Sequence, residues 1–333
     1  MKRTFLLALS VALLAGVFAA CGGDGGKDGG GLRRVTLMLD WTPNTNHTGI
    51  YVAKEKGWYA DEGLDVQIVE PAEAGVNQVV GAGQADFGIS FQEQVIPARE
   101  QGVPVVSIAA IIQHNTSSLA SLAERQIKRP RDLEGKTYGG FGGALEREII
   151  SRLVACDGGD PSKVKFVEVG NVDYLVGMDR GDYDVVWIFD GWEGIRFTEI
   201  EKRQMNFIRF IDYTECIPDW YTPIIITNER MIAEHPEVVR AFMRATAKGY
   251  RFAIEHPDEA ADILLKAVPE LDPQLVRLSA RYLAGKYTDP GHPWGLQDEA
   301  VWANFERFVR EAKLTTQPVD VSKAYTNDFL PRD

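Results

Sequence analysis

Residues 35–56 read VTLMLDWTPNTNHTGIYVAKEK, so that an apolar run, a polar loop and a helical pattern follow one another directly. The apolar run at 35–39 is short, which is typical of a buried strand. From about Thr48 onward, apolar residues such as Ile50 and Ala53 recur on one face of a helix. This stretch therefore predicts a strand joined to a helix, the repeating unit of an α/β fold with a parallel sheet.

The same alternation continues along the chain in two sets. The first set has predicted strands at 64–69, 87–90 and 105–112 and a helix near 75–82. The second set has predicted strands at 137–139, 164–168, 184–189 and 207–211 and helices at 144–156 and near 172–180. A strand at 221–227 and helices at 237–255, 258–267, 273–283 and 297–312 follow. Each set has enough strands for a sheet of its own, so we expect two lobes.

The length of the chain also indicates two lobes. Without its first twenty residues the chain has about 310 residues, which is more than one hydrophobic core usually supports. We expect residues 32–117 and 218–333 to form the first lobe and residues 118–217 the second. The crossings near 113–120 and 214–222 then provide a hinge, because rotation of a few residues there opens and closes a cleft.

The first twenty residues are typical of a secretory signal peptide, with two basic residues before an apolar run at 5–18. That run is shorter than the roughly 20 residues that cross a bilayer. Residues 18–21 resemble a bacterial lipobox, which implies that Cys21 becomes a lipid-carrying N-terminus. The Gly-rich residues 22–31 are typical of a flexible tether. We therefore expect a lipid anchor on the extracytoplasmic face of the cell membrane.

Composition narrows the class of protein. Removing Lys2 and Arg3 from the 36 basic residues leaves 34 against 48 acidic ones, a formal charge of −14, which argues against nucleic acid as a partner. Cys156 and Cys216 either form a disulfide in an oxidising compartment or remain buried thiols, and their spacing does not distinguish the two. The sequence shows no cluster of metal ligands and no nucleophile–base motif. We therefore expect a binding protein, not an enzyme, without cofactor or metal.

Ligands of open α/β sheets bind beyond the carboxyl ends of the strands, so the loops there are the candidate site. The loop after the first strand carries Trp41, which offers a face for stacking, and Asn44 and His47, which offer donors and acceptors to the edge of a ring. The loop after the strand at 87–90 carries Phe91 and Glu93. Capping of the following helix is the alternative role of polar residues in both loops.

In the second lobe the glycine loop 139–143 carries Phe141 and opens a helix, which lets backbone amides approach a ligand. A purely structural turn is the alternative, and phosphate binding is disfavoured because the Lys and Ser/Thr of a P-loop are absent. Asp190, Trp192 and Glu193 follow the strand at 184–189, and carboxylates accept from ring N–H, amino or hydroxyl groups. Alternatively, Trp192 belongs to the core and Glu193 is solvated.

Tyr221, in the second crossing, adds aromatic surface near the hinge. Its alternative role is buried structure.

Four segments resemble the periplasmic binding proteins related to the thiamine-pyrimidine-precursor proteins, and these are residues 39–49, 53–59, 83–88 and 191–194. The resemblance implies a two-lobed type II periplasmic binding protein fold and a ligand clamped between aromatic rings. It also implies the permease and ATPase subunits of an ABC importer as partners. The fungal pyrimidine synthase shares this fold and uses pyridoxal phosphate and an iron site fed by a cysteine-rich motif, which this chain lacks.

Family members resemble binders of formylaminopyrimidine, a thiamine precursor, and a related branch serves riboflavin. Asp190 stands where the pyrimidine binders carry Tyr, and Gly142 and Gly143 replace bulkier residues. Smaller side chains widen a cleft, which suits the three-ring isoalloxazine, and Asp190 can accept hydroxyls of the ribityl chain. We therefore expect a monomeric riboflavin-binding lipoprotein, with formylaminopyrimidine as the alternative ligand and a synthase-like enzyme as a remote alternative.

Overall fold

The computed structural model describes residues 31–170 and 172–332. The predicted signal peptide, the predicted lipidation site Cys21 and tether residues 22–30 lie outside the described residues. Within the described ranges, no helix combines the length and the apolar character needed to cross a membrane.

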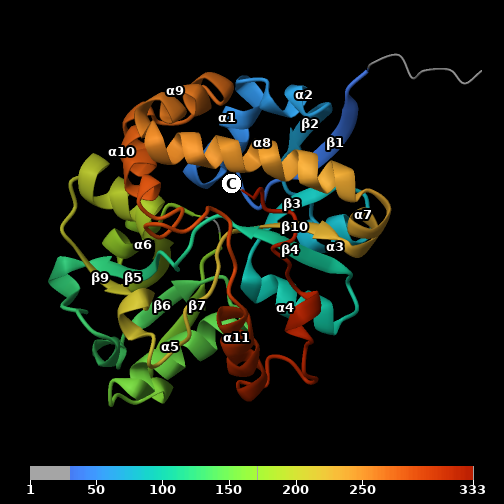
Figure 1. Cartoon of the computed structure of the whole chain (residues 1–333). Coiled ribbons are helices and arrows are strands. Elements are labelled where there is room, and N and C mark those ends of the chain that lie inside the picture. Colours follow the sequence, from blue (N-terminus) through green and yellow to red (C-terminus); the bar gives the residue numbers. More distant parts are fainter. Residues whose placement is uncertain (1–30, 171, 333) are drawn as a thin grey trace, which may run out of the picture. The chain divides into compact units, whose positions relative to one another are not determined.

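Ten strands of the described chain form two five-stranded sheets (Figure 1). The first sheet has the order β2-β1-β3-β10-β4 and consists of β1 (Arg33–Met38), β2 (Leu64–Val69), β3 (Phe87–Ser90), β4 (Val105–Ala110) and β10 (Ile224–Asn228). The second has the order β7-β6-β8-β5-β9 and consists of β5 (Ser117–Leu122), β6 (Thr137–Gly140), β7 (Lys165–Glu168), β8 (Val185–Phe189) and β9 (Met205–Arg209). The expected two-lobed α/β fold is confirmed.

The two sheets share one pattern of strand direction. In the first sheet β1 pairs parallel with β2 and β3, whereas β10 pairs antiparallel with β3 and β4. In the second sheet β6 pairs parallel with β7 and β8, whereas β5 pairs antiparallel with β8 and β9. Each sheet therefore contains one antiparallel strand that follows directly on a crossing from the other sheet.

Helices cover both faces of the first sheet because successive side chains of a strand point to opposite faces. Val35 and Leu37 of β1 pack with α1 (Thr48–Glu55) and α8 (Pro236–Glu255). The other face packs against α3 (Val76–Gly81), α4 (Gln92–Glu100) and α11 (Glu299–Glu311). Helices α1 and α8 cross closely, since a Cβ on Gly249 would overlap the carbonyl oxygen of Gly49. This close approach holds the loop after β1 against the sheet.

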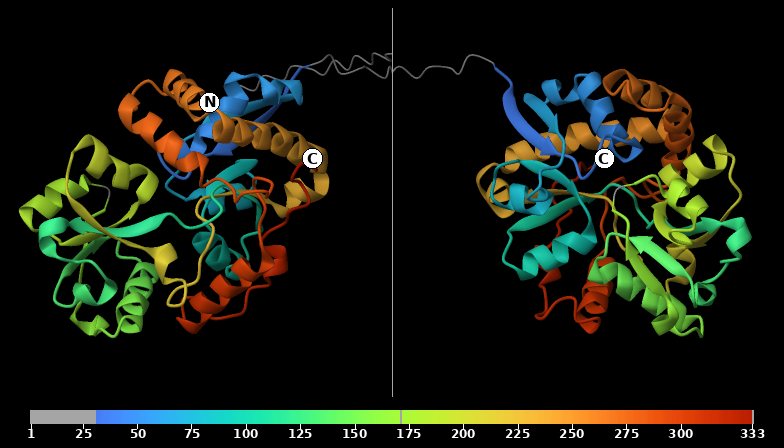
Figure 2. Two further views of the ribbon diagram at one scale, coloured as in Figure 1. Left: turned by 60° about the vertical axis from the view of Figure 1, so that its left-hand side comes forward. Right: turned by 180° about the vertical axis from the view of Figure 1, so that it is seen from behind.

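The second sheet is likewise covered by helices on both faces (Figure 2). Leu119 and Val185 pack with α5 (Ala144–Cys156), whereas Ala120 and Val186 pack with α6 (Tyr174–Arg180). The remaining α-helices of the described chain are α2 (Trp58–Asp61), α7 (Glu229–Glu234), α9 (Pro257–Ala267) and α10 (Pro273–Ala284). Two π-helical segments, Asp190–Gly194 and Arg196–Ile200, follow β8.

Most predicted elements agree with the structure to within two residues, but two segments differ. The predicted polar crossing already enters a strand at Ser117, because the serines of β5 are buried and paired in the sheet. The strand predicted at 221–227 begins at Ile224, after Pro223, which has no N–H for a ladder. The strand predicted at 207–211 agrees to within two residues with β9, which ends at Arg209, before a tight turn at Phe210–Tyr213.

The crossings are packed and cross-linked. Trp220 lies among the rings of Trp187, Phe210 and Phe305, so the second crossing belongs to a core cluster that draws on both sheets. A disulfide joins Cys156 at the end of α5 to Cys216, with 5.7 Å between the Cα atoms. The two cysteines, whose pairing the spacing left open, therefore anchor the start of the second crossing to the second lobe.

Candidate ligand-binding site

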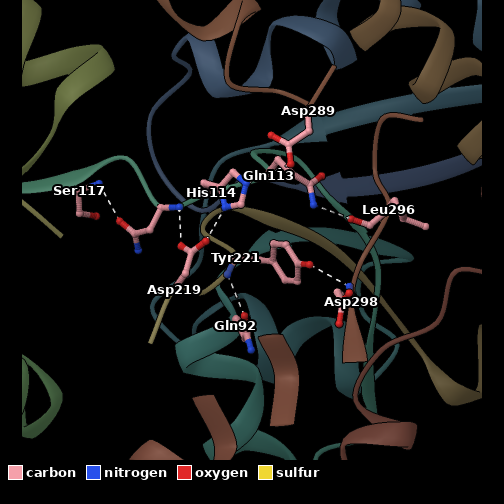
Figure 3. A network of polar contacts seen from close by, with 10 residues as sticks. Gln92, Gln113, His114, Ser117, Asp219, Tyr221, Asp289, Leu296 and Asp298 are labelled. Carbon is pink, nitrogen blue, oxygen red and sulfur yellow. Dashed lines mark hydrogen bonds and ion pairs between the residues drawn. The ribbon is translucent and has the colours of Figure 1, made fainter. Parts of the chain in front are cut away.

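The turn after β3 is bonded directly to the second crossing (Figure 3). The side-chain oxygen of Gln92 accepts from the Tyr221 N–H at 2.8 Å, and the Gln92 N–H donates to the Tyr221 carbonyl at 3.1 Å. The indole N–H of Trp220 donates to Glu93 Oε2 at 2.9 Å. Phe91, half-buried, precedes α4 in the same turn. The predicted residues Phe91 and Glu93 are thus placed at the crossing.

The π-helical segment that begins at Asp190, directly after β8, is bonded to the first crossing. The Asp190 N–H donates to the Thr116 carbonyl at 2.9 Å, and the Ser118 hydroxyl donates to Asp190 Oδ1 at 2.6 Å. Arg209 Nε lies 3.4 Å from Asp190 Oδ2. Glu193 accepts the N–H of Phe189 at 3.1 Å, which ties its carboxylate to the end of the strand. Asp190 and Glu193 therefore flank the same crossing from the second lobe.

The loop after β1 is a rigid turn that presents one aromatic ring. His47 is fully buried, its Nδ1 accepts from the Asn44 N–H at 3.2 Å, and its Nε2 lies 2.7 Å from Asp40 Oδ1. Because Nδ1 accepts, the ring proton sits on Nε2 and points to Asp40. Asn44 accepts the Asn46 N–H, which caps the short helix that follows. The side chain of Trp41, in contrast, is 40% exposed and therefore accessible from solvent.

The glycine loop after β6 presents Phe141, which is 54% exposed. Glu146 accepts the N–H of Gly143 at 2.9 Å and that of Phe141 at 3.2 Å, so the amides that could hold a phosphate are already occupied. Gly142 has φ +81°, and a Cβ there would overlap the carboxylate of Glu168. The space that the small residues were expected to open is therefore filled by Glu168.

Trp192 packs into a contact between the second lobe and α10. Its ring is partly buried against a cluster that includes Tyr51 and Val276. The Ser279 hydroxyl donates to the carbonyl of the adjacent Gly191. This placement corresponds to the alternative in which Trp192 is a packing residue.

A histidine joins both crossings to the loop before α11 (Figure 3). His114 Nδ1 lies 2.6 Å from Asp219 Oδ2, and its Nε2 lies 3.1 Å from Asp289 Oδ2. Its hydrogen bond with Asp219, and then that with Asp289, raise the pKa of His114 to about 9. Tyr221 is fully buried, and its hydroxyl accepts the Asp298 N–H at 2.8 Å. Tyr221 therefore has the buried structural role that was its alternative.

Three carboxyl groups beside the crossings have raised pKa values because burial disfavours their charged forms. Burial raises the pKa of Glu93 to about 8, against the opposing effect of hydrogen bonds that include the one from Trp220. Burial also raises the pKa values of Asp190 and Glu193, although Ser118 and Arg209 stabilise the ionised form of Asp190. A carboxyl group accepts hydrogen bonds when it is ionised and donates one when it is protonated, so this set suits a ligand that has both donors and acceptors.

The crossings also contain polar residues that are not among the predicted ligand residues. Six buried side-chain nitrogen or oxygen atoms of the described chain have no hydrogen-bond partner in the protein, and four of them belong to Gln113, Asn115, Ser117 and Thr222. Each unpaired buried polar group lowers the free energy of unfolding by about 1–3 kcal/mol, so several such atoms in one region indicate a binding site for a ligand or water. The signal in the sequence is the run of amides and hydroxyls at 113–118.

A groove on the second lobe, away from the crossings, is another candidate for a binding site. A groove of about 540 Å³ on the second lobe is lined by exposed side chains such as Val167, Val172 and Val176. Its Tyr183 hydroxyl already donates to the Tyr174 carbonyl, whereas the crossings contain buried polar atoms without a partner in the protein, which makes the crossings the candidate site. Within residues 31–170 and 172–332, no group of three or more His, Cys, Asp or Glu residues could hold a metal ion.

The structure thus brings Phe91, Glu93, Asp190 and Glu193 to the crossings. It exposes Trp41 and Phe141 in neighbouring loops. Contact of these residues with a ligand stays a prediction.

Comparisons with known proteins show which family this chain resembles. The family model described as NMT1/THI5 like matches residues 44–260. A formylaminopyrimidine-binding protein of Halalkalibacterium halodurans is 32% identical over 98% of this chain and 99% of its own length. A 4-amino-5-hydroxymethyl-2-methylpyrimidine phosphate synthase of Legionella pneumophila is 30% identical over 90% of this chain and 92% of its own. The riboflavin-binding protein RibY of Chloroflexus aurantiacus is 28% identical over 90% of this chain and 87% of its own.

A solved structure supports the fold. The periplasmic aliphatic sulphonate binding protein SsuA of Escherichia coli matches with a TM-score of 0.69, covering 88% of this chain and 97% of that protein. At 14% identity this likeness shows the fold alone, which is the periplasmic binding protein fold expected from the sequence. With the family model covering more than half of its length, the chain belongs to the NMT1/THI5-like family.

Proposed function

We propose that this protein is the extracytoplasmic binding component of an importer and that its ligand is the formylaminopyrimidine N-formyl-4-amino-5-aminomethyl-2-methylpyrimidine. The observation that carries the proposal is the similarity to a formylaminopyrimidine-binding protein over 98% of the chain. The riboflavin-binding relative is less similar and covers less of the chain. Riboflavin, the ligand expected from the sequence, therefore gives way to its alternative.

The geometry weighs against the wide cleft on which the argument for riboflavin rests. That argument assumed that Gly142 leaves space for three rings. Glu168 occupies the space beside Gly142. A single pyrimidine ring needs less room than isoalloxazine, so the filled loop favours the smaller ligand.

The chemistry of a 4-aminopyrimidine matches the carboxyl groups beside the crossings. Its amino group donates two hydrogen bonds, which Asp190 and Glu193 can accept. Its ring nitrogens accept, and Glu93, with a pKa of about 8, is mostly protonated at neutral pH and can donate to one of them. The exposed rings of Trp41 and Phe141 offer stacking surfaces, each worth about 0.5–1.5 kcal/mol beyond the buried area.

A synthase activity is the second candidate, because several relatives carry that name. Pyridoxal phosphate, which the fungal synthase uses, is held as a Schiff base by a lysine. The candidate loops at 40–48, 90–94, 113–118, 139–146 and 190–194 contain no lysine. These residues do not fit that cofactor, so we propose binding without chemistry.

Partners and location follow from the same proposal. A binding component of this kind hands its ligand to the permease of an importer that an ATPase drives. The predicted signal peptide and the predicted lipid at Cys21 would hold the protein at the outer face of the membrane, with residues 22–31 as the tether.

Isothermal titration calorimetry tests the proposal on the chain without residues 1–21. We expect saturable 1:1 binding of formylaminopyrimidine, at least about tenfold tighter than any binding of riboflavin. Binding of riboflavin alone would overturn the choice of ligand. Turnover of the pyrimidine, followed by mass spectrometry in the same samples, would overturn the binding-only role.

A further inference from the structure

We propose that Asn115 is a specificity-determining residue of this site, and that its amide N–H groups, with the Ser117 hydroxyl, bind the carbonyl oxygen of the ligand's formamide group. This inference rests on the proposed function, because it assigns the atoms that recognise one end of a formylaminopyrimidine.

Asn115 makes one backbone and one side-chain hydrogen bond, and the second determines which way its amide faces. Its backbone N–H donates to Asp219 Oδ1 at 2.9 Å, and its Oδ1 accepts the Ser117 N–H at 2.7 Å. An N–H must face an oxygen, so the amide cannot be flipped without losing the second bond. The nitrogen Nδ2 therefore carries two N–H groups that neither bond uses.

The unpaired atoms of this segment call for an acceptor. Asn115 is 3% exposed and Ser117 is 1% exposed, yet neither Asn115 Nδ2 nor Ser117 Oγ has a hydrogen-bond partner in the protein. Buried polar groups in folded proteins are nearly always paired. Because Nδ2 can only donate and the hydroxyl can donate, one oxygen acceptor placed between them would satisfy both.

Hydrogen bonds connect the segment of Asn115 to two of the carboxyl groups beside the crossings. The carbonyl of Thr116, the next residue, accepts the Asp190 N–H. Asp219, which accepts the Asn115 N–H, directly precedes Trp220, whose indole N–H donates to Glu93. A ligand that binds Asn115 through an acceptor would therefore have carboxyl groups nearby for its donors.

The formyl group is the feature that distinguishes two related ligands at such a site. N-formylation turns an aminomethyl arm, which is an ammonium group at neutral pH, into a neutral formamide with a carbonyl acceptor. The donors of Asn115 and Ser117 pair with that oxygen, whereas an ammonium group would place donors against donors. The site should therefore prefer the formylated ligand to the free amine.

The substitution Asn115→Asp tests this assignment with almost no change of shape. The new side chain keeps an oxygen for the Ser117 N–H but replaces the donor by a second carboxylate oxygen. By calorimetry, the wild-type chain without residues 1–21 should bind the formylated ligand at least about tenfold tighter than the amine. Asn115→Asp should weaken binding of the formylated ligand at least about tenfold and reverse the preference. Residues 32–333 form a compact unit of their own, so this form is suitable.

Two further variants keep the test decisive. Ser117→Ala should weaken binding of the formylated ligand about threefold to tenfold and leave the amine unchanged. Asn206→Asp makes the same change of charge beside Ser121, away from the Ser117 end of β5, and should alter neither affinity. Thermal unfolding checks that each variant is folded.

The outcomes separate this inference from the proposed function. If Asn115→Asp keeps wild-type affinity and preference, the assignment of Asn115 is wrong while the proposed function stands. If Asn115→Asp does not fold, an unchanged affinity of Ser117→Ala overturns the carbonyl site. If the wild type binds neither pyrimidine, the proposed function and the inference both fall.

Discussion

The disulfide between Cys156 and Cys216 should contribute about 4 kcal/mol to the free energy of unfolding. The two residues are 60 positions apart. Closing a loop of that length removes about 14 cal/mol/K of entropy from the unfolded chain, which is about 4 kcal/mol at 25 °C. Replacing both cysteines by serine restores that entropy. The double variant should therefore unfold about 10 °C below the wild type, since about 1 kcal/mol shifts the midpoint by about 2–4 °C for a domain of this size.

Urea unfolding followed by circular dichroism measures the effect on the chain without residues 1–21, which has no other cysteine. The oxidised wild type, the reduced wild type and the double serine variant are compared. The reduced wild type and the variant should agree with each other, and dithiothreitol should not change the variant. A loss of less than about 1 kcal/mol in both would refute the account based on chain entropy.

Three other substitutions test the site and its electrostatics. The pKa of Glu93 is raised to about 8 in the folded protein, so its contribution to the free energy of unfolding is complete below pH 4.5 and is lost as pH rises through 8. Glu93→Gln should remove this loss of stability with pH in urea titrations from pH 4 to 9. The pKa of His114 is raised to about 9, so the stabilisation from Asp219 and Asp289 is complete below pH 6.5 and is lost as pH rises through 9. His114→Gln should remove that loss, and an unchanged profile would contradict the ion pairs. Trp41→Ala should weaken ligand binding at least about tenfold in fluorescence titrations without lowering the unfolding temperature, because the ring is 40% exposed; equal affinity would remove Trp41 from the site.

The fold was predictable from the sequence because most strands are short apolar runs and most helices carry a clear apolar face. Strand β2 and helix α5 have the predicted bounds. Strand β5 was not predicted, because its buried serines make the segment read as a polar loop. Two of those serines are tolerated inside because the Ser118 hydroxyl donates to Asp190 and the Ser121 hydroxyl to the Ile127 carbonyl, and these contacts belong to the tertiary structure.

The position of the site was predictable from topology, but its detailed chemistry was not. Strand ends define which loops face the crossings, and this rule led to Glu93 and Asp190. The width of the cleft depended on Glu168, which lies 26 residues after Gly142 and fills the space beside it. The unpaired Nδ2 of Asn115 can be recognised only in the structure, which shows that Oδ1 accepts the Ser117 N–H and that Nδ2 has no partner. Contacts between distant residues decide such features, and local patterns do not encode them.

The antiparallel strands that follow the crossings also set an order of assembly. The second sheet is built from one continuous stretch of chain, β5 to β9, whereas the first sheet lacks β10 until residue 228 has been made. Until then β3 and β4 have no strand between them, and their facing edges are unpaired. In a chain that emerges from a ribosome or a translocation channel N-terminus first, the middle segment is the one able to complete its sheet early. The first sheet therefore begins to form first but is completed last. Its unpaired strand edges are where a stalled or truncated chain would aggregate.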